Sequence, residues 1–191
     1  MARPVRVAFE TGLTRRRLAV LLRLPLAIPA LAVFCAWSVV AVPAHLVSWP
    51  VVVARGRLPR RFQRFLCAYL RYSVQLGAWL TLVTRRYPTL RRRRPQPVEV
   101  VADREPQPRL TALLRPVLAL PGLVLGSVFG VVLAAAAIAA WFVALVRGRT
   151  TEGLRELGAF CLRYQTEVVA YVLLLTPRAP RLAPPPADYE S

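Results

Sequence analysis

The sequence contains no lysine, a single histidine and few acidic residues, although it has 191 residues. Its 27 basic side chains are all arginines and are accompanied by only nine carboxylates, which gives a net charge of +18. Catalysis needs positioned acids, bases, nucleophiles or metal ligands, and most of these residue types are in short supply. The sequence has no phosphate-cradling glycine loop and no serine elbow. We therefore predict that the protein is not an enzyme, with no catalytic residue and no cofactor.

The few groups that could support chemistry have simpler explanations. The three cysteines lie in apolar surroundings, and their spacing fits neither a disulfide framework nor a zinc site. His45 lies in an apolar run, where a packed or lipid-facing imidazole is expected. Glu152 and Glu156 lie one turn apart at an expected helix start, where negative charge favours the helix dipole. No metal site is predicted.

Two long stretches, residues 24–54 and 116–146, contain no charged residue. Each exceeds the roughly 20 residues that a helix needs to cross the hydrocarbon of a bilayer. The chain is 56% hydrophobic with a mean hydropathy of +0.45, which is too apolar for an ordinary soluble domain. In the second stretch, Gly122, Gly126 and Gly130 either allow a close approach of another helix or are small apolar fillers. We predict an all-α protein of the cytoplasmic membrane.

The chain repeats itself. Shifted by 92 positions, it lies on itself without a gap, so that Arg55-Gly56-Arg57 meets Arg147-Gly148-Arg149 and Trp49 meets Trp141. One register through apolar stretches, turns and aromatic positions indicates two copies of one unit. We expect the following organisation: a basic tail at 1–17, a membrane repeat at 18–90, an arginine- and proline-rich linker at 91–109, a second membrane repeat at 110–182, and a disordered tail at 183–191.

Residues 14–18, which include three arginines, and the apolar run after them imitate a secretory or twin-arginine signal peptide. The same apolar element recurs deep inside the second copy, where no signal peptide can lie. Its length also exceeds the usual signal core of about 7–15 residues. We therefore expect the element to be retained.

Each repeat is expected to be a helical hairpin, with a second helix at about residues 60–84 and 151–176. These second helices either span the bilayer, which gives about four membrane helices in total, or lie flat in its interface. We favour spanning, because the last turns of the first of them are apolar nearly all round.

The second helices carry polar residues at corresponding positions: Arg71 and Gln75 in the first copy, Arg163 and Glu167 in the second. An arginine inside a bilayer costs about 2.5–3.5 kcal/mol and must face protein or water. Glu167 lies one turn beyond Arg163 and offsets its charge, whereas Arg71 has Gln75 in that place. We predict either a contact of Arg71 with Glu167 or Gln75, or arginines that snorkel to the surface.

Arginine counts predict the orientation of four spanning helices. Both tails and the linker would share one side, and the arginines of the N-terminal tail, Arg23 included, and of the linker place that side in the cytoplasm. The turn around residues 55–64 is itself basic, so the bias is imperfect. The copies would then be parallel repeats related by an axis along the membrane normal.

Several motifs together resemble one known family, the bacterial membrane family catalogued as domain of unknown function 4389. The similar segments of the first copy are residues 24–29, Gly56-Arg57-Leu58-Pro59-Arg60, Arg71-Tyr72 and residues 82–88; those of the second include Gly148-Arg149, Arg163-Tyr164 and Leu174-Leu175-Thr176. The chain departs from the family pattern where Arg85 and Pro177 replace an aspartate, and where Gln75 and Glu167 replace an arginine. The resemblance implies a membrane protein in two tandem copies and supplies no activity.

The sequence favours a non-enzymatic scaffold or accessory protein whose basic cytoplasmic face holds anionic lipids, each arginine contributing about 1 kcal/mol. Its partners would be the bilayer and either further copies of the chain or another membrane protein. Nucleic acid is not expected, because no soluble basic domain with groove-reading elements is visible. The alternative is a small oligomeric transporter or channel whose intramembrane arginines line an anion path; a lipid-handling enzyme is a remote third hypothesis. The candidate interaction residues are Arg55, Gly56, Arg57, Arg71, Gln75, Arg147, Gly148, Arg149, Arg163 and Glu167.

Overall fold

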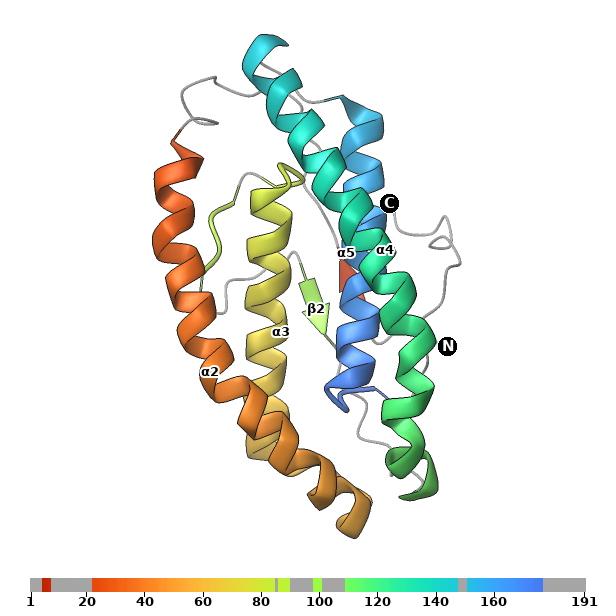
Figure 1. Ribbon diagram of the computed structural model, residues 1–191. Coiled ribbons are helices and arrows are strands. Elements are labelled where there is room, and N and C mark those ends of the chain that lie inside the picture. Colours follow the sequence, from red (N-terminus) through yellow and green to blue (C-terminus); the bar gives the residue numbers. More distant parts are fainter. Residues whose placement is uncertain are drawn as a thin grey trace.

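The computed structural model describes residues 5–7, 22–84, 86–89, 98–100, 109–147 and 151–176. This part of the chain forms four helices and two short strands (Figure 1): β1 (Val5–Val7), α2 (Arg23–Arg55), α3 (Arg60–Leu80), β2 (Val98–Val100), α4 (Arg109–Arg147) and α5 (Glu152–Val172). The prediction of two tandem helical hairpins is confirmed, with α2 and α3 as the first hairpin and α4 and α5 as the second. Gly148, Arg149 and the tail at 183–191 lie outside the described residues.

The all-α prediction is confirmed for the described residues, apart from two strands of three residues each. They pair antiparallel, although they lie in segments expected to be a basic tail and a solvated linker. Their sequences are Val-Arg-Val and Val-Glu-Val, and the register places Arg6 opposite Glu99. Valine favours extended backbone, and opposite charges at facing positions stabilise a strand pair. The N-terminal segment and the linker are therefore joined at this point.

The turn of the first hairpin depends on a glycine. Gly56 has a φ of 67°, in the left-handed region, and its N–H donates to the carbonyl of Val52 at 2.7 Å. Glycine adopts this conformation without a steric penalty, so it ends α2 cleanly. Pro59 then stands at the N-cap of α3, where its missing N–H removes no helical hydrogen bond.

The two hairpins lie antiparallel, with their turns at opposite ends of the molecule (Figure 1). Near the end of α4, the indole N–H of Trp141 donates to the carbonyl of Leu80 at the end of α3, at 3.0 Å. At the other end of the molecule, Val52 near the end of α2 packs against Leu174, which follows α5. The expectation of parallel repeats related by an axis along the membrane normal is therefore wrong.

The reason for this arrangement lies in the contact between α3 and α5. These two helices run antiparallel, and their apolar faces form the central core: Leu66, Leu70 and Val74 pack with Ala170, Leu173 and Leu175. Glycines permit the close approach further along, because a Cβ at Gly77 would stand 3.0 Å from Leu162 and one at Gly158 would stand 2.9 Å from Val83. Sequence periodicity identifies such faces but does not say in which direction they meet.

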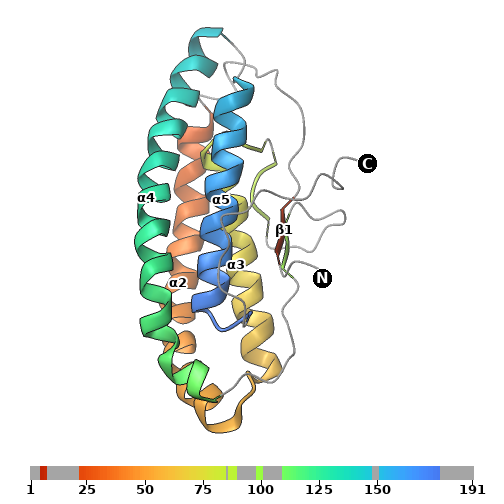
Figure 2. The same ribbon diagram turned by 90° about the vertical axis from the view of Figure 1, so that its right-hand side faces the viewer.

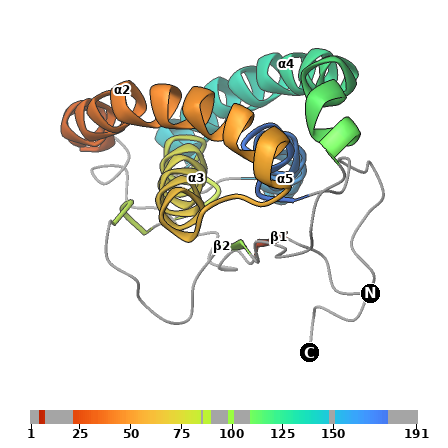
Figure 3. The same ribbon diagram turned by 90° about the horizontal axis from the view of Figure 1, so that it is seen from below.

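The elements form three layers. Figures 2 and 3 show α2 and α4 on one side, α3 and α5 in the middle, and the β1–β2 ribbon on the far side. The ribbon rests on the middle layer, with β2 against α3 and β1 against α5. The two most apolar helices therefore form one outer layer by themselves.

Candidate membrane-contact face

The outer layer formed by α2 and α4 exposes apolar side chains along its whole length. Ile28 and Val39 on α2 are 70% and 74% exposed, and Val131 on α4 is 72% exposed. Further exposed apolar residues of this face are Leu26, Leu31, Val40, Val42, Leu46 and Val47 on α2, and Leu113, Leu114, Val117, Leu118, Leu120, Val124, Val128, Ile138, Phe142 and Val146 on α4. We call this surface the apolar face.

Two of the described helices are long and apolar enough to cross a membrane, over Pro25–Arg55 and Leu113–Arg147. In the most apolar 18-residue stretch of each, only 11% and 22% of the residues are buried. Core helices of soluble proteins are mostly buried, and monomeric soluble proteins rarely expose a continuous apolar patch of more than a few hundred Å². The apolar face therefore requires an apolar neighbour.

The predicted polar residues lie in the middle layer. Arg71, Arg163 and Glu167 are half-buried, and the guanidinium of Arg163 lies 5.5 Å from the ring centre of Phe160 on its own helix. The side-chain carbonyl oxygen of Gln75 accepts a hydrogen bond from the backbone N–H of Thr89, at 3.1 Å. The contact between Arg71 and Glu167 stays a prediction.

The first turn is strongly basic. Arg55 and Arg57, on either side of Gly56, are exposed, and so are three arginines in the first turns of α3: Arg60, Arg61 and Arg64. These five residues, called here the basic end, adjoin the end of the apolar face. Arg147 is exposed at the opposite end of the molecule.

Two buried arginines were not singled out from the sequence. Arg23, counted above with the surface charges of the tail, is only 6% exposed at the start of α2. Its guanidinium donates to the backbone carbonyl of Trp79 and, at 3.0 Å, to that of Thr84, and it lies 5.3 Å from the Trp79 ring centre. Arg23 thus closes the open end of the first hairpin.

The second hairpin repeats this contact at the corresponding positions. Arg115 is 2% exposed, donates to the carbonyls of Tyr171 (3.4 Å) and Thr176 (3.1 Å), and lies 4.6 Å from the Tyr171 ring centre. In both copies the backbone reverses after the second helix through a leucine in the left-handed region, with φ of 61° at Leu82 and 62° at Leu174.

We call each of these contacts an arginine clamp. One acceptor of each clamp, Trp79 or Tyr171, lies in the last turn of a helix, where the carbonyls carry a partial negative charge that attracts a guanidinium. The other acceptor, Thr84 or Thr176, lies in the segment after the helix. The recurrence of Arg23 as Arg115, with Thr84 as Thr176, was the sequence signal that could have revealed the clamps.

Comparison with known proteins agrees with the duplication. A family model described as "Domain of unknown function (DUF4389)" matches residues 17–90 and again residues 109–183. Each match covers one hairpin with its arginine clamp. No curated protein and no solved structure matches the chain.

Proposed function

The chain belongs to this family of unknown function in two tandem copies, and from that premise we propose that it is a non-enzymatic scaffold of the cytoplasmic membrane. The observation that carries the proposal is the apolar face, which stays exposed along α2 and α4. Water contact with apolar surface costs about 25 cal/mol per Å². Lipid tails remove this cost, so the bilayer is the partner that fits the face.

The distribution of positive charge indicates which class of lipid the protein prefers. The basic end lies next to the last apolar turns of α2, so its arginines reach headgroups when the apolar face lies in hydrocarbon. Each arginine near an anionic surface contributes about 1 kcal/mol, and the net charge of +18 acts in the same sense. We therefore propose anionic phospholipids as the preferred neighbours of the basic end.

The membrane part of the proposal is tested by washing membranes that contain the full chain with alkaline carbonate. The protein should remain in the membrane pellet. Release into the supernatant, or a monodisperse protein in buffer without detergent, would contradict the proposal.

The lipid part is tested by thermal unfolding in detergent with added phosphatidylglycerol or phosphatidylcholine. We expect phosphatidylglycerol to raise the unfolding temperature more, and we expect this difference to disappear when the five arginines of the basic end are replaced by glutamine. Arg147→Gln removes an exposed arginine at the opposite end and should keep most of the difference. Equal effects of the two lipids on the native protein would refute the lipid preference.

The alternative, an oligomeric anion channel, needs Arg71 and Arg163 to face a pore. The position of the Arg163 guanidinium over the Phe160 ring gives this arrangement no support. If chloride flux into proteoliposomes is observed and disappears in Arg71→Leu and Arg163→Leu variants, the channel hypothesis is supported and the scaffold hypothesis is rejected.

A further inference from the structure

The positions of the helix ends restrict how the molecule can lie relative to a bilayer. α3 ends beside the end of α4, as the hydrogen bond from Trp141 to Leu80 shows. α4 begins at the opposite end of the molecule, where Arg115 contacts the carbonyl of Tyr171 in the last turn of α5 and that of Thr176 just after it. If the four helices stood upright in a membrane, the chain between α3 and α4 would have to cross it.

That connecting segment is unsuited to a bilayer. It spans residues 81–108 and includes four consecutive arginines at positions 91–94. An arginine at the bilayer centre costs about 2.5–3.5 kcal/mol on insertion scales. The acidic residues Glu99, Asp103 and Glu105 in the same segment add to this cost. Upright insertion of this arrangement is therefore strongly disfavoured.

The length of the apolar helices points the same way. α4 has 39 residues, and its exposed apolar side chains extend from Leu113 to Val146, a length of about 50 Å at 1.5 Å per residue. The hydrocarbon core is only about 30 Å thick. An upright α4 would leave roughly 20 Å of apolar surface among headgroups or in water, whereas a helix in the membrane plane leaves none.

We propose that the molecule lies in the plane of the membrane, with α2 and α4 inside one leaflet and α3, α5 and the ribbon on its aqueous side. The layers fit this placement: a helix is about 10–12 Å wide with its side chains, and one leaflet offers about 15 Å of hydrocarbon. Among the described residues, the large exposed apolar side chains lie almost entirely on α2 and α4; the exceptions are Leu22 just before α2, Tyr87 after α3 and Leu157 on α5.

This inference rests on the proposed function, because it presupposes a membrane protein. It goes further in that the protein contacts the hydrocarbon of a single leaflet. Both hairpin turns and the linker then lie on the same side of the bilayer. An upright molecule, whether its hairpins are parallel or antiparallel, places at least one of these three segments on the other side.

Single cysteines can distinguish these arrangements. Arg57→Cys marks the first turn, Thr89→Cys the start of the linker, and Glu152→Cys the start of α5; all three positions are exposed. They are introduced into the full chain after replacement of its three native cysteines by alanine. A membrane-impermeant maleimide is applied to intact spheroplasts and again after permeabilisation.

In-plane insertion predicts that the three sites behave alike, either all protected or all labelled in intact spheroplasts. Labelling that separates Thr89→Cys from the other two indicates upright parallel hairpins. Labelling that separates Arg57→Cys from the other two indicates upright antiparallel hairpins. Either result overturns the inference.

The carbonate wash is run on the same membranes. If the chain is released, the proposed function fails; if it is retained and the sites differ, only the in-plane orientation fails. Should the cysteine-free chain not accumulate, Cys35→Ser alone is used as the background. Cys67 is half-buried and Cys161 buried, and the parent without an added cysteine measures their labelling.

Discussion

The two hairpins are copies of one unit in sequence, and they share one aromatic contact between their helices but differ next to it. Trp37 packs on Tyr72 in the first hairpin, with ring centres 5.7 Å apart, and Phe129 packs on Tyr164 at the corresponding positions of the second, at 4.9 Å.

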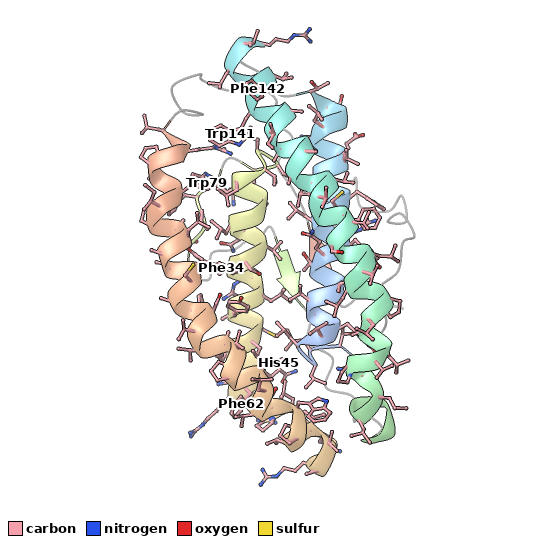
Figure 4. The ribbon with its side chains drawn as sticks, viewed as in Figure 1. Phe34, His45, Phe62, Trp79, Trp141 and Phe142 are labelled. Carbon is pink, nitrogen blue, oxygen red and sulfur yellow. The ribbon has the colours of Figure 1, made fainter. Side chains whose placement is uncertain are left out.

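In the first hairpin, Phe34 projects from α2 toward α3 (Figure 4) and stacks on Tyr69, with ring centres 5.6 Å apart. The hydroxyl groups of Ser38 and Tyr69 lie 3.0 Å apart, within hydrogen-bond distance. In the second hairpin, the positions of Phe34 and Ser38 are occupied by Gly126 and Gly130.

α4 and α5 lie in closer contact than α2 and α3 do, and the two glycines stand on α4 where it faces α5. A Cβ at Gly126 would stand 3.8 Å from Val168, and one at Gly130 would stand 3.0 Å from the side-chain nitrogen of Gln165. The same nitrogen donates to the carbonyl of Gly126 at 3.3 Å. A Cβ would therefore be in ordinary contact at Gly126 and in a tight contact with the end of a flexible side chain at Gly130. Both interpretations of these glycines, close helix approach and small apolar filler, stay predictions.

This comparison separates the two requirements of the fold. Both hairpins keep an aromatic contact between their helices, whereas the neighbouring positions hold Phe34 and Ser38 in one and glycines in the other. The side chains that fill the space between two helices can therefore change as long as the space stays filled. The arginine clamp, by contrast, recurs with the same pair of acceptors, one carbonyl in the last turn of the second helix and one in the segment that follows it. The clamp at the hairpin end is therefore the contact that the two copies share most closely.

The largest effect is expected when a clamp is broken. Arg115→Leu removes the donors to two carbonyls at the buried end of α5, and hydrogen bonds to a charged group contribute about 1.5–3 kcal/mol each. We expect a loss of about 3 kcal/mol, measured as denaturant unfolding in detergent. Arg23→Leu should lose a similar amount, which tests whether the two clamps are equivalent.

Lysine variants control for charge. Arg115→Lys keeps the positive charge but lacks the planar fork that reaches two carbonyls, so it should fall between the native protein and Arg115→Leu. A lysine variant as stable as the native protein would mean that charge alone, and not the fork, holds the hairpin end.

A smaller loss of stability is expected when a residue between the helices of one hairpin is introduced into the other hairpin. Gly126→Phe introduces the residue of the first hairpin into the second, where Val168 leaves room for a Cβ but not for a ring. Overpacking of this kind costs about 1–3 kcal/mol. Gly126→Ala is the matched control and should be tolerated, so equal stability of the two variants would show that the α4–α5 spacing is adaptable.

The smallest effect concerns the turns. Gly56→Ala forces a side chain into the left-handed region at a φ of 67° and should cost about 1 kcal/mol. Gly148 corresponds to Gly56 in the second copy, and Gly148→Ala should cost the same if both turns are built alike. A neutral Gly148→Ala in the same unfolding assay would show that the turns, like the interiors, have diverged.

Much of the local structure could be predicted. Residues 24–54 and 116–146 were expected as apolar helices, and α2 and α4 contain them. Gly56 was expected in a turn and ends α2. The clamps were missed because an arginine that begins a helix looks like a surface charge, and its acceptors lie 56 and 61 residues further along the chain. The β1–β2 ribbon was missed because three-residue strands carry little periodicity.

By itself, the sequence determined the duplication, the helices and the need for an apolar environment, since these follow from residue order and from uncharged runs longer than a bilayer requires. Only the tertiary structure decided that the hairpins lie antiparallel and that α2 and α4 share one face. The relative direction of the hairpins and the choice of neighbouring helices depend on how the side chains of distant segments pack together. Here α3 packs against α5, and each arginine contacts the far end of its hairpin. No local pattern encodes that fit.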